Sequence, residues 1–213
     1  MSDVVIIDYG IGNLLSVRRA IEFCGASVDI SNDPSTILSA PRVILPGVGA
    51  FSNGMAELRR LGLDNVVRQI ATCGTPLLGI CLGMQMLLDG SDEFGANSGL
   101  GLIPGWVVKV PPIDAVGNPL KIPHIGWGSL TLAPGRTSWC GTLLEDVHTE
   151  EAVYFVHSFM AVPQNESNRV ADCHYSGVAI AAVIQNGNIT GCQFHPEKSG
   201  DVGLRILRRF VTQ

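Results

Sequence analysis

The chain contains Pro76-Leu77-Leu78-Gly79-Ile80-Cys81-Leu82-Gly83-Met84-Gln85, in which an apolar run meets a segment of good helix formers. The run from 77 to 80 is short and apolar, which is typical of a strand buried on both faces of a parallel sheet. Methionine and leucine dominate residues 84–88 and have high helix propensity. The stretch therefore predicts a strand, a sharp turn and a helix in direct succession.

Cys81 stands at the apex of this turn, with a glycine two residues away on each side. The pattern is the cysteine form of the nucleophile elbow, where the backbone is crowded and a Cβ on either glycine would clash. The start of a helix also favours a thiolate, because its first N–H groups have no partner. We therefore favour a nucleophile. The alternative is a structural cysteine packed as a small hydrophobe.

Length and composition limit the possible classes of protein. The 213 residues, 46% hydrophobic and 15% charged, suffice for a single folded domain over 1–213 and disfavour disorder. A net charge of −5 without a Lys/Arg run disfavours nucleic-acid binding. No apolar run reaches the roughly 18 residues of a membrane span, and the N-terminus lacks a basic signal region. We therefore expect a cytoplasmic protein that contacts no membrane.

The six cysteines form no C-x-x-C pair, so we expect neither disulfides nor a zinc site. Cys192 and His195 have a C-x-x-H spacing, but no second ligand pair lies nearby. The pair Gly10-x-Gly12 resembles part of a dinucleotide fingerprint, yet leucine occupies residue 15, where the third glycine would stand. We predict no metal and no cofactor, and a close-fitting strand-to-helix loop at Gly10.

The first half of the chain alternates strands with helices. Strands are expected at 4–7, 27–30, 43–45 and 77–80, and helices at 14–21, 55–61 and 64–71, with Asn13 and Asp64 as helix caps. This order predicts an α/β fold with a doubly wound, mostly parallel sheet flanked by helices. In such sheets the site lies at the carboxyl ends of the strands, where Cys81 and the loop Pro46–Phe51 both fall. Glycines 47 and 49 allow that loop to present N–H groups to a ligand.

The second half reads as short strands at 107–110, 130–132, 152–156, 169–173, 178–184 and 189–193, after a polar surface loop at 89–101. Asn186-Gly187 is a strong hairpin signal. We expect these strands to be antiparallel and to extend the edge of the parallel sheet. An amphipathic helix over 201–211 closes the chain.

His195 and Glu197 follow the last predicted strand. A histidine, with an unperturbed pKa of about 6.5, suits a base that takes the thiol proton and later returns one to a leaving amine. A carboxylate two residues on can fix the imidazole tautomer. Alone, this pair is better explained as a chance feature of a surface loop. Together with an elbow cysteine, it favours catalysis.

These motifs, Gly79–Gly83 with His195-Pro196-Glu197, resemble those of the class I (triad) glutamine amidotransferase family over essentially the whole chain. Further motifs are similar to those of the family branch that forms the glutaminase subunits of imidazole glycerol phosphate synthases. They are Pro46-Gly47-Val48-Gly49-Ala50-Phe51, Pro123-His124-Ile125-Gly126-Trp127, Tyr154-Phe155-Val156-His157-Ser158-Phe159 and the segment 193–200.

The resemblance implies a flavodoxin-like fold and a glutaminase that releases glutamate and ammonia. It also implies a heterodimer with a (β/α)₈-barrel cyclase, which receives the ammonia and makes imidazole glycerol phosphate and aminoimidazole carboxamide ribotide in histidine biosynthesis. By motif position, Cys81 is the nucleophile, His195 the base and Glu197 its orienting group.

The remaining site residues are also implied by motif position. The oxyanion would lie between Gly49 and Leu82, with Val48 in the peptide that turns toward it. Glutamine would be held by Gln85, Glu93 and the backbone of Ser158 and Phe159, while His157 either supports this site or fills space beside it. The partner face would include Asn13, His124, Trp127 and Lys198.

Two positions depart from the family pattern. Gly128 stands where asparagine is usual, which puts a side-chain contact near the partner in doubt, and Phe159 replaces a frequent tyrosine. Because a peptide turns easily beside glycine, we hypothesise that the Val48-Gly49 peptide is misoriented until the partner is loaded. The alternatives are a protein feeding ammonia to another synthase, a free-standing γ-glutamyl hydrolase, a nucleotide-binding module and a thiol-containing binding subunit.

Overall fold

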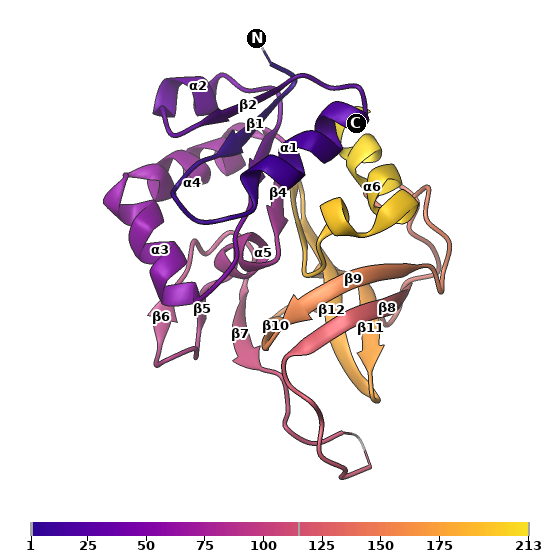
Figure 1. Ribbon diagram of the computed structural model, residues 1–213. Coiled ribbons are helices and arrows are strands. Elements are labelled where there is room, and N and C mark those ends of the chain that lie inside the picture. The colour runs from indigo at the N-terminus through magenta and orange to yellow at the C-terminus, as the bar shows by residue number, and fades with distance from the viewer. Residues whose placement is uncertain (1, 115, 213) are drawn as a thin grey trace.

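The computed structural model describes residues 2–114 and 116–212, and a nine-stranded sheet forms its centre (Figure 1). Five short strands are parallel and run in the order β2-β1-β3-β4-β13. They are β1 (Val4–Ile7), β2 (Val28–Ser31), β3 (Val43–Leu45), β4 (Leu77–Ile80) and β13 (Ile189–Cys192). The α/β class and the parallel core are as predicted, and β2 lies one residue beyond its predicted range.

Four antiparallel strands continue the sheet in the order β12-β11-β8-β9. They are β12 (Val178–Asn186), β11 (Arg169–Tyr175), β8 (His124–Leu132) and β9 (Ala152–His157). The expectation that all later strands extend the edge is wrong for β13 and for the strand predicted at 107–110, which lies in a second, smaller sheet. Strand β13 forms a hairpin with β12 but lies parallel to β4 in the middle of the sheet.

The insertion of β13 beside β4 brings the segment that carries Cys81 next to the segment that carries His195. Cys192 is the register partner of Ile80, so the residues that follow each strand leave the same edge of the sheet. The Cys81 N–H also donates to the Cys192 carbonyl at 2.8 Å. Cys81 and Cys192, more than a hundred positions apart in the chain, are thus neighbours at the edge of the sheet where the site lies.

Helices cover both faces of the parallel strands. One face carries α1 (Leu14–Phe23) and α6 (Gly200–Thr212), which lie side by side in Figure 1. The other carries α2 (Pro34–Leu38), α3 (Phe51–Arg60), α4 (Leu63–Cys73) and the short α5 (Leu82–Met86). Within β1, Val4 and Ile6 face the first set while Val5 and Ile7 face the second. Both sides of β1, β3 and β4 are therefore buried, which explains their apolar sequences, whereas the edge strand β2 is only partly buried.

Neither predicted helix cap forms as expected. Asn13 precedes α1, but its side chain makes no capping bond. Gly62, in the left-handed region, precedes α4, so Asp64 lies in the first turn and forms an ion pair with Arg68. An acidic residue in the first turn is still favourable toward the helix dipole.

A smaller sheet, in the order β10-β7-β5-β6, packs beside the large one. Its strands are β5 (Gly90–Ser91), β6 (Asn97–Ser98), β7 (Gly105–Lys109) and β10 (Phe159–Pro163). The predicted surface loop 89–101 is therefore partly wrong, because Gly90 and Ser91 are buried strand residues. Only Ser158 separates β9 from β10, so this residue forms the corner between the two sheets.

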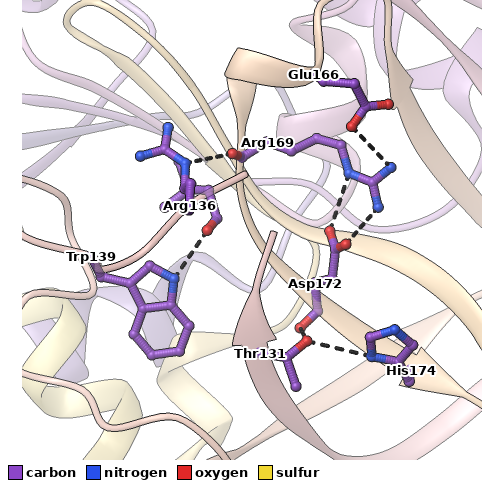
Figure 2. Close-up of polar contacts among 8 residues, drawn as sticks. Thr131, Arg136, Trp139, Glu166, Arg169, Asp172 and His174 are labelled. Carbon is purple, nitrogen blue, oxygen red and sulfur yellow. Dashed lines mark hydrogen bonds and ion pairs between the residues drawn. The ribbon is translucent and has the colours of Figure 1, made fainter. Parts of the chain in front are cut away.

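Figure 2 shows a polar cluster in which the Thr131 hydroxyl of β8 donates to the Asp172 carbonyl of β11 at 3.3 Å. The buried Asp172 carboxylate accepts two hydrogen bonds from Arg169, at 3.2 and 2.7 Å, and Arg169 also pairs with Glu166 at 3.6 Å. Trp139 is buried and its indole N–H donates to the Val170 carbonyl. Burial raises the pKa of Asp172, and Arg169 opposes that rise. The cluster fixes the antiparallel half of the sheet.

All six cysteines are unpaired thiols. Across residues 2–114 and 116–212, the helices lack the length and apolarity needed to span a bilayer. In the same ranges, no group of three or more His, Cys, Asp or Glu side chains is arranged to hold a metal ion.

Candidate functional site

The turn between β4 and α5 is as tight as the glycine spacing predicted. Cys81 has φ 54° and ψ −109°, outside the regions that L residues ordinarily occupy. A Cβ on Gly79 would lie 2.8 Å from the Gly83 carbonyl carbon, and one on Gly83 would overlap the Leu45 carbonyl. The turn from β4 into α5 therefore requires glycine at 79, and the packing of the elbow against β3 requires glycine at 83.

The Cys81 side chain opens into a pocket of about 240 Å³ at the carboxyl ends of the parallel strands. Most of the residues expected at the site meet here. The lining residues are Val48, Gly49, Cys81, Leu82, Gln85, Val156, His157, Ser158, Phe159 and His195. The pocket thus brings together segments that follow β3, β4, β9 and β13.

His195 and Glu197 form a close pair at one wall of this pocket. The two atoms His195 Nδ1 and Glu197 Oε1 are 2.8 Å apart, and the side chains are 2% and 1% exposed. A carboxylate can only accept a hydrogen bond, so Nδ1 carries the proton and Nε2 takes no part in the bond to Glu197. Nε2 has no hydrogen-bond partner among the described residues. The imidazole is therefore oriented with one nitrogen available at the pocket.

The negative charges of Glu197 and of an ionised Cys81 favour the protonated, imidazolium form of His195. Burial lowers the pKa of His195, but the adjacent Cys81 and Glu197 more than offset this effect and raise it to about 9. Ser199 supports the base from behind: its hydroxyl donates to the His195 carbonyl at 2.6 Å and accepts from Tyr154 N at 3.0 Å. The site can therefore hold a thiolate and an imidazolium together.

The glycine loop after β3 forms the opposite wall. The Tyr9 hydroxyl donates to the Pro46 carbonyl at 2.7 Å, and a Cβ on Gly47 would lie 2.5 Å from that hydroxyl oxygen. The Leu82 N–H donates to the Gly47 carbonyl at 3.3 Å. Gly49 has φ +99°, and Val48 is 41% exposed. One of the two amides expected at the oxyanion is thus already engaged by the loop itself.

Gln85 lies at the pocket floor with its amide orientation fixed. Its Nε2 donates to the Phe159 carbonyl at 3.1 Å and to Gln193 Oε1 at 3.0 Å. Both amide hydrogens are therefore used, which leaves Gln85 Oε1 as an acceptor for a ligand in the pocket.

His157 and His124 form a buried pair behind the pocket. His157 Nδ1 lies 2.9 Å from the Phe159 carbonyl, an acceptor, so Nδ1 carries the proton and Nε2 accepts from His124 Nδ1 at 3.1 Å. Burial lowers the pKa of each to about 4. The expectation that His124 faces a partner is wrong, because its ring is 3% exposed and stacks on Phe155 and Tyr175.

Other expected residues lie outside the pocket. Glu93 does not line it; its carboxylate accepts from the Phe51 N–H at 2.6 Å and so stabilises the start of α3. Trp127, 59% exposed, lies in strand β8 and not in a loop, and Lys198 is exposed in the 3₁₀ turn η2 (Pro196–Lys198). Asn13 is half-buried before α1.

Gly128, which stands where asparagine is usual in the family, does not affect a contact with the partner, contrary to the expectation. Position 128 faces inward in β8, where a Cβ would lie 2.5 Å from the Cys173 sulfur and 3.2 Å from the Phe155 ring. The missing side chain therefore concerns packing behind the pocket and not a contact at the exposed face.

The sequence reasoning missed two residues that touch the site. Gln193 is fully buried and its Nε2 lies 3.8 Å from Cys81 Sγ. Its position two residues before His195 at a strand end was a usable signal, because alternate residues of an extended segment share a face. Tyr9, which anchors the glycine loop, carried no comparable signal.

Comparisons with known proteins were made on the sequence and on the fold. The family model for glutamine amidotransferase class-I matches residues 5–213. The imidazole glycerol phosphate synthase subunit HisH 1 of Legionella pneumophila (strain Lens) is 53% identical over 211 residues, 99% of both chains. The subunit HisH of Geobacillus sp. (strain WCH70) is 45% identical over 207 residues, 97% of this chain and 95% of that one.

Solved structures agree at the level of the fold. A crystal structure described as a glutamine amidotransferase matches with a TM-score of 0.72 at 17% identity and covers 98% of this chain and 99% of its own. The glutaminase domain of CTPS from Trypanosoma brucei, solved with bound acivicin, matches with a TM-score of 0.65 at 14% identity over 99% of this chain and 94% of its own. The fold of this chain is thus similar to both along nearly its whole length.

Proposed function

Because this chain belongs to the glutamine amidotransferase class-I family, we propose that it is the glutaminase subunit of an imidazole glycerol phosphate synthase, acting in histidine biosynthesis. The observation that carries the proposal is the meeting of Cys81 and the His195–Glu197 pair in one pocket. Full-length identity of 53% to such a subunit from Legionella pneumophila supports the substrate and the pathway.

The first half of the reaction forms a thioester. The Cys81 sulfur attacks the carboxamide carbon of glutamine, and the carbonyl oxygen becomes an oxyanion. Its donors would be the Leu82 and Gly49 N–H groups, each worth about 2.7–4 kcal/mol to the transition state. When the C–N bond breaks, imidazolium His195 donates its Nε2 proton to the departing ammonia.

The second half releases glutamate. Neutral His195 takes a proton from water as the water oxygen attacks the thioester carbon, and the C–S bond then breaks to give glutamate and the thiolate. Glu197 keeps the proton on Nδ1 throughout, so that Nε2 is always the nitrogen facing the reacting atoms. One glutamine and one water thus yield one glutamate and one ammonia.

Substrate is held by groups whose orientation is already set. Gln85 Oε1 remains available as an acceptor, and Ser158 and Phe159 line the pocket at the corner between the two sheets. Glu93 would contribute to the glutamine site through the segment that it anchors at the start of α3. The supporting pair of His157 and His124 fixes the Phe159 carbonyl from the far side.

The ammonia is passed to a cyclase partner, a (β/α)₈ barrel, in a cytoplasmic heterodimer. The exposed apolar side chains of Leu15, Ile125, Trp127 and Val48, with Asn13 and Lys198, would meet this partner. Partner loading would turn the Val48-Gly49 peptide and release the Leu82 amide from the Gly47 carbonyl. Hydrolysis would then be slow until the cyclase can use the ammonia.

Glutamate release from glutamine is the test. The purified chain is measured alone, with the cyclase, and with the cyclase plus its nucleotide ligand, beside a Cys81→Ala variant. We expect rapid turnover only in the loaded complex and none in the variant. Equal rates for the isolated chain and the loaded complex would exclude partner control. Wild-type behaviour of Cys81→Ala would exclude the nucleophile.

A further inference from the structure

We propose that Gln193 is a positioning residue for the nucleophile, holding the Cys81 sulfur through a hydrogen bond from its side-chain amide. The inference rests on the role proposed above for Cys81. Gln193 directly follows β13, is fully buried, and its Nε2 lies 3.8 Å from Cys81 Sγ.

The direction of the Gln193 amide is forced by its neighbours. The Phe159 carbonyl can only accept, so it requires the NH₂ group of Gln85 to face it. The same Gln85 nitrogen donates to Gln193 Oε1 at 3.0 Å, which turns the NH₂ group of Gln193 toward the sulfur. Reversing Gln85 would place its oxygen against the Phe159 carbonyl, and reversing Gln193 would place two NH₂ donors against each other. The chain of amides therefore ends in a donor aimed at Cys81.

A donor at this point favours the ionised sulfur. The Val156 carbonyl lies 4.0 Å from the same sulfur and suits a thiol, because a thiol can donate to it and a thiolate cannot. The Gln193 N–H has the opposite preference, since hydrogen bonds to ionised acceptors are about twice as strong as neutral ones. A methionine would fill a similar volume without any buried amide, so packing alone does not explain a glutamine here.

Substitution of Gln193 leaves the other titratable groups around Cys81 in place. The groups that interact electrostatically with Cys81 or line the same pocket are Tyr9, Cys192, His157 and His195, the last of which is paired with Glu197. Burial raises the pKa of both Tyr9 and Cys192, and burial lowers the pKa of His157 to about 4. The His195–Glu197 pair is thus the main charged neighbour. Because Cys81 helps to raise the pKa of His195 to about 9, the pH profile reports Cys81 and His195 as a coupled pair.

The experiment follows the alkylation of Cys81 by iodoacetamide in the full chain from pH 5 to 9, read on the Cys81 peptide by mass spectrometry. Gln193→Met removes the donor, and Gln193→Glu places a carboxylate beside the sulfur. Gln185→Met serves as the matched control, because Gln185 is a half-buried glutamine in β12 whose side chain bonds its own turn at Gly187. Circular dichroism and urea midpoints establish that each variant is folded.

We expect the midpoint of the pH profile to rise by about one unit in Gln193→Met, a tenfold slower reaction below the midpoint. It should rise further in Gln193→Glu and stay unchanged in Gln185→Met. With the cyclase present, kcat for glutamine should fall about tenfold in Gln193→Met while KM changes less than about threefold.

An unshifted midpoint in either folded Gln193 variant would overturn the proposal, as would an equal shift in Gln185→Met. Alkylation requires no glutaminase activity, so the two proposals fail separately. The wild-type complex could lack glutaminase activity while the alkylation midpoint still rises from wild type to Gln193→Met to Gln193→Glu. That result would refute the proposed function and leave the role of Gln193 standing.

Discussion

His124 and His157 are register partners on β8 and β9, and the nitrogens His124 Nδ1 and His157 Nε2 are 3.1 Å apart. Both rings are buried, and His157 in turn donates to the Phe159 carbonyl at the pocket wall. Ile125 and Trp127, on either side of Gly126 in the same strand, are exposed. The pair therefore lies between the exposed side chains of β8 and the glutamine pocket, and it requires both imidazoles to be neutral.

Acid should destabilise the protein through this pair. The pKa of each ring is lowered to about 4, so between pH 6.5 and 4 the unfolded chain binds more protons than the folded one. The stabilising contribution is complete above about pH 6.5 and is lost as pH falls, by at most about 1.4 kcal/mol per pH unit for each ring. Urea unfolding at pH 7.5, 6 and 5 measures the slope. His124→Phe should roughly halve it, and an unchanged slope would contradict this account.

Glu197→Gln should impair the orientation of the His195 imidazole without impairing glutamine binding. The amide can donate to Nδ1 and so select the wrong tautomer, for which we expect a loss of about 10³–10⁴ in kcat with little change in KM. The wild-type pair persists up to about pH 9, because Cys81 and Glu197 outweigh burial in raising the pKa of His195. The alkaline limb of the rate profile should therefore move to lower pH in the variant. A loss confined to KM would argue against an orienting role.

Gly49→Ala should impair turnover more than folding. Gly49 and Gly25 both have left-handed φ values, +99° and +91°, and open space where a Cβ would stand, so alanine strains each equally, by about 1–2 kcal/mol. Only Gly49 lies in the loop that would supply an oxyanion donor. Alanine keeps the N–H but favours a negative φ, which would turn this N–H away from the oxyanion. We therefore expect a loss of up to about 10²–10³ in kcat for Gly49→Ala and wild-type kcat for Gly25→Ala, measured with the cyclase. Equal kcat values would remove Gly49 from the oxyanion site.

Gly128→Ala should be destabilising, and a second substitution should relieve it. The added Cβ would lie 2.5 Å from the Cys173 sulfur, so overpacking should cost about 1–3 kcal/mol. Gly128→Ala combined with Cys173→Ala should regain most of that loss, which a double-mutant cycle of urea unfolding measures. Affinity for the cyclase should not change, because position 128 faces inward. Simple additivity would contradict the packing explanation.

Arg169→Met should lower stability without touching the glutamine pocket. The substitution leaves the Asp172 carboxylate, 2% exposed, without its ion-pair partner, at a cost of roughly 3–5 kcal/mol. Arg18→Met breaks an exposed pair with Glu22 and should cost no more than about 0.5 kcal/mol. Urea unfolding compares the two, and glutaminase activity of the folded Arg169→Met complex should equal that of the wild type.

Residue types and their spacing were enough to predict the local structure of the site. Gly79, Cys81 and Gly83 predicted the elbow, and the strained Cys81 backbone with its crowded glycines confirms that geometry. The alternation of short apolar runs with helices predicted the parallel strands. These inferences succeed because they depend on sterics and burial within a few residues of each other, which spacing alone encodes.

Tertiary structure alone decided which distant groups meet. The Asn186-Gly187 turn places β13 beside β12, but no local signal places β13 against β4. That second pairing sets Cys192 opposite Ile80 and so brings His195 and Gln193 to Cys81. Likewise, His124 was expected at a partner face, and its pairing with His157 buries it instead. Strand order and side-chain contact depend on which buried surfaces fit one another across the whole chain, and a pattern read along one segment does not contain that information.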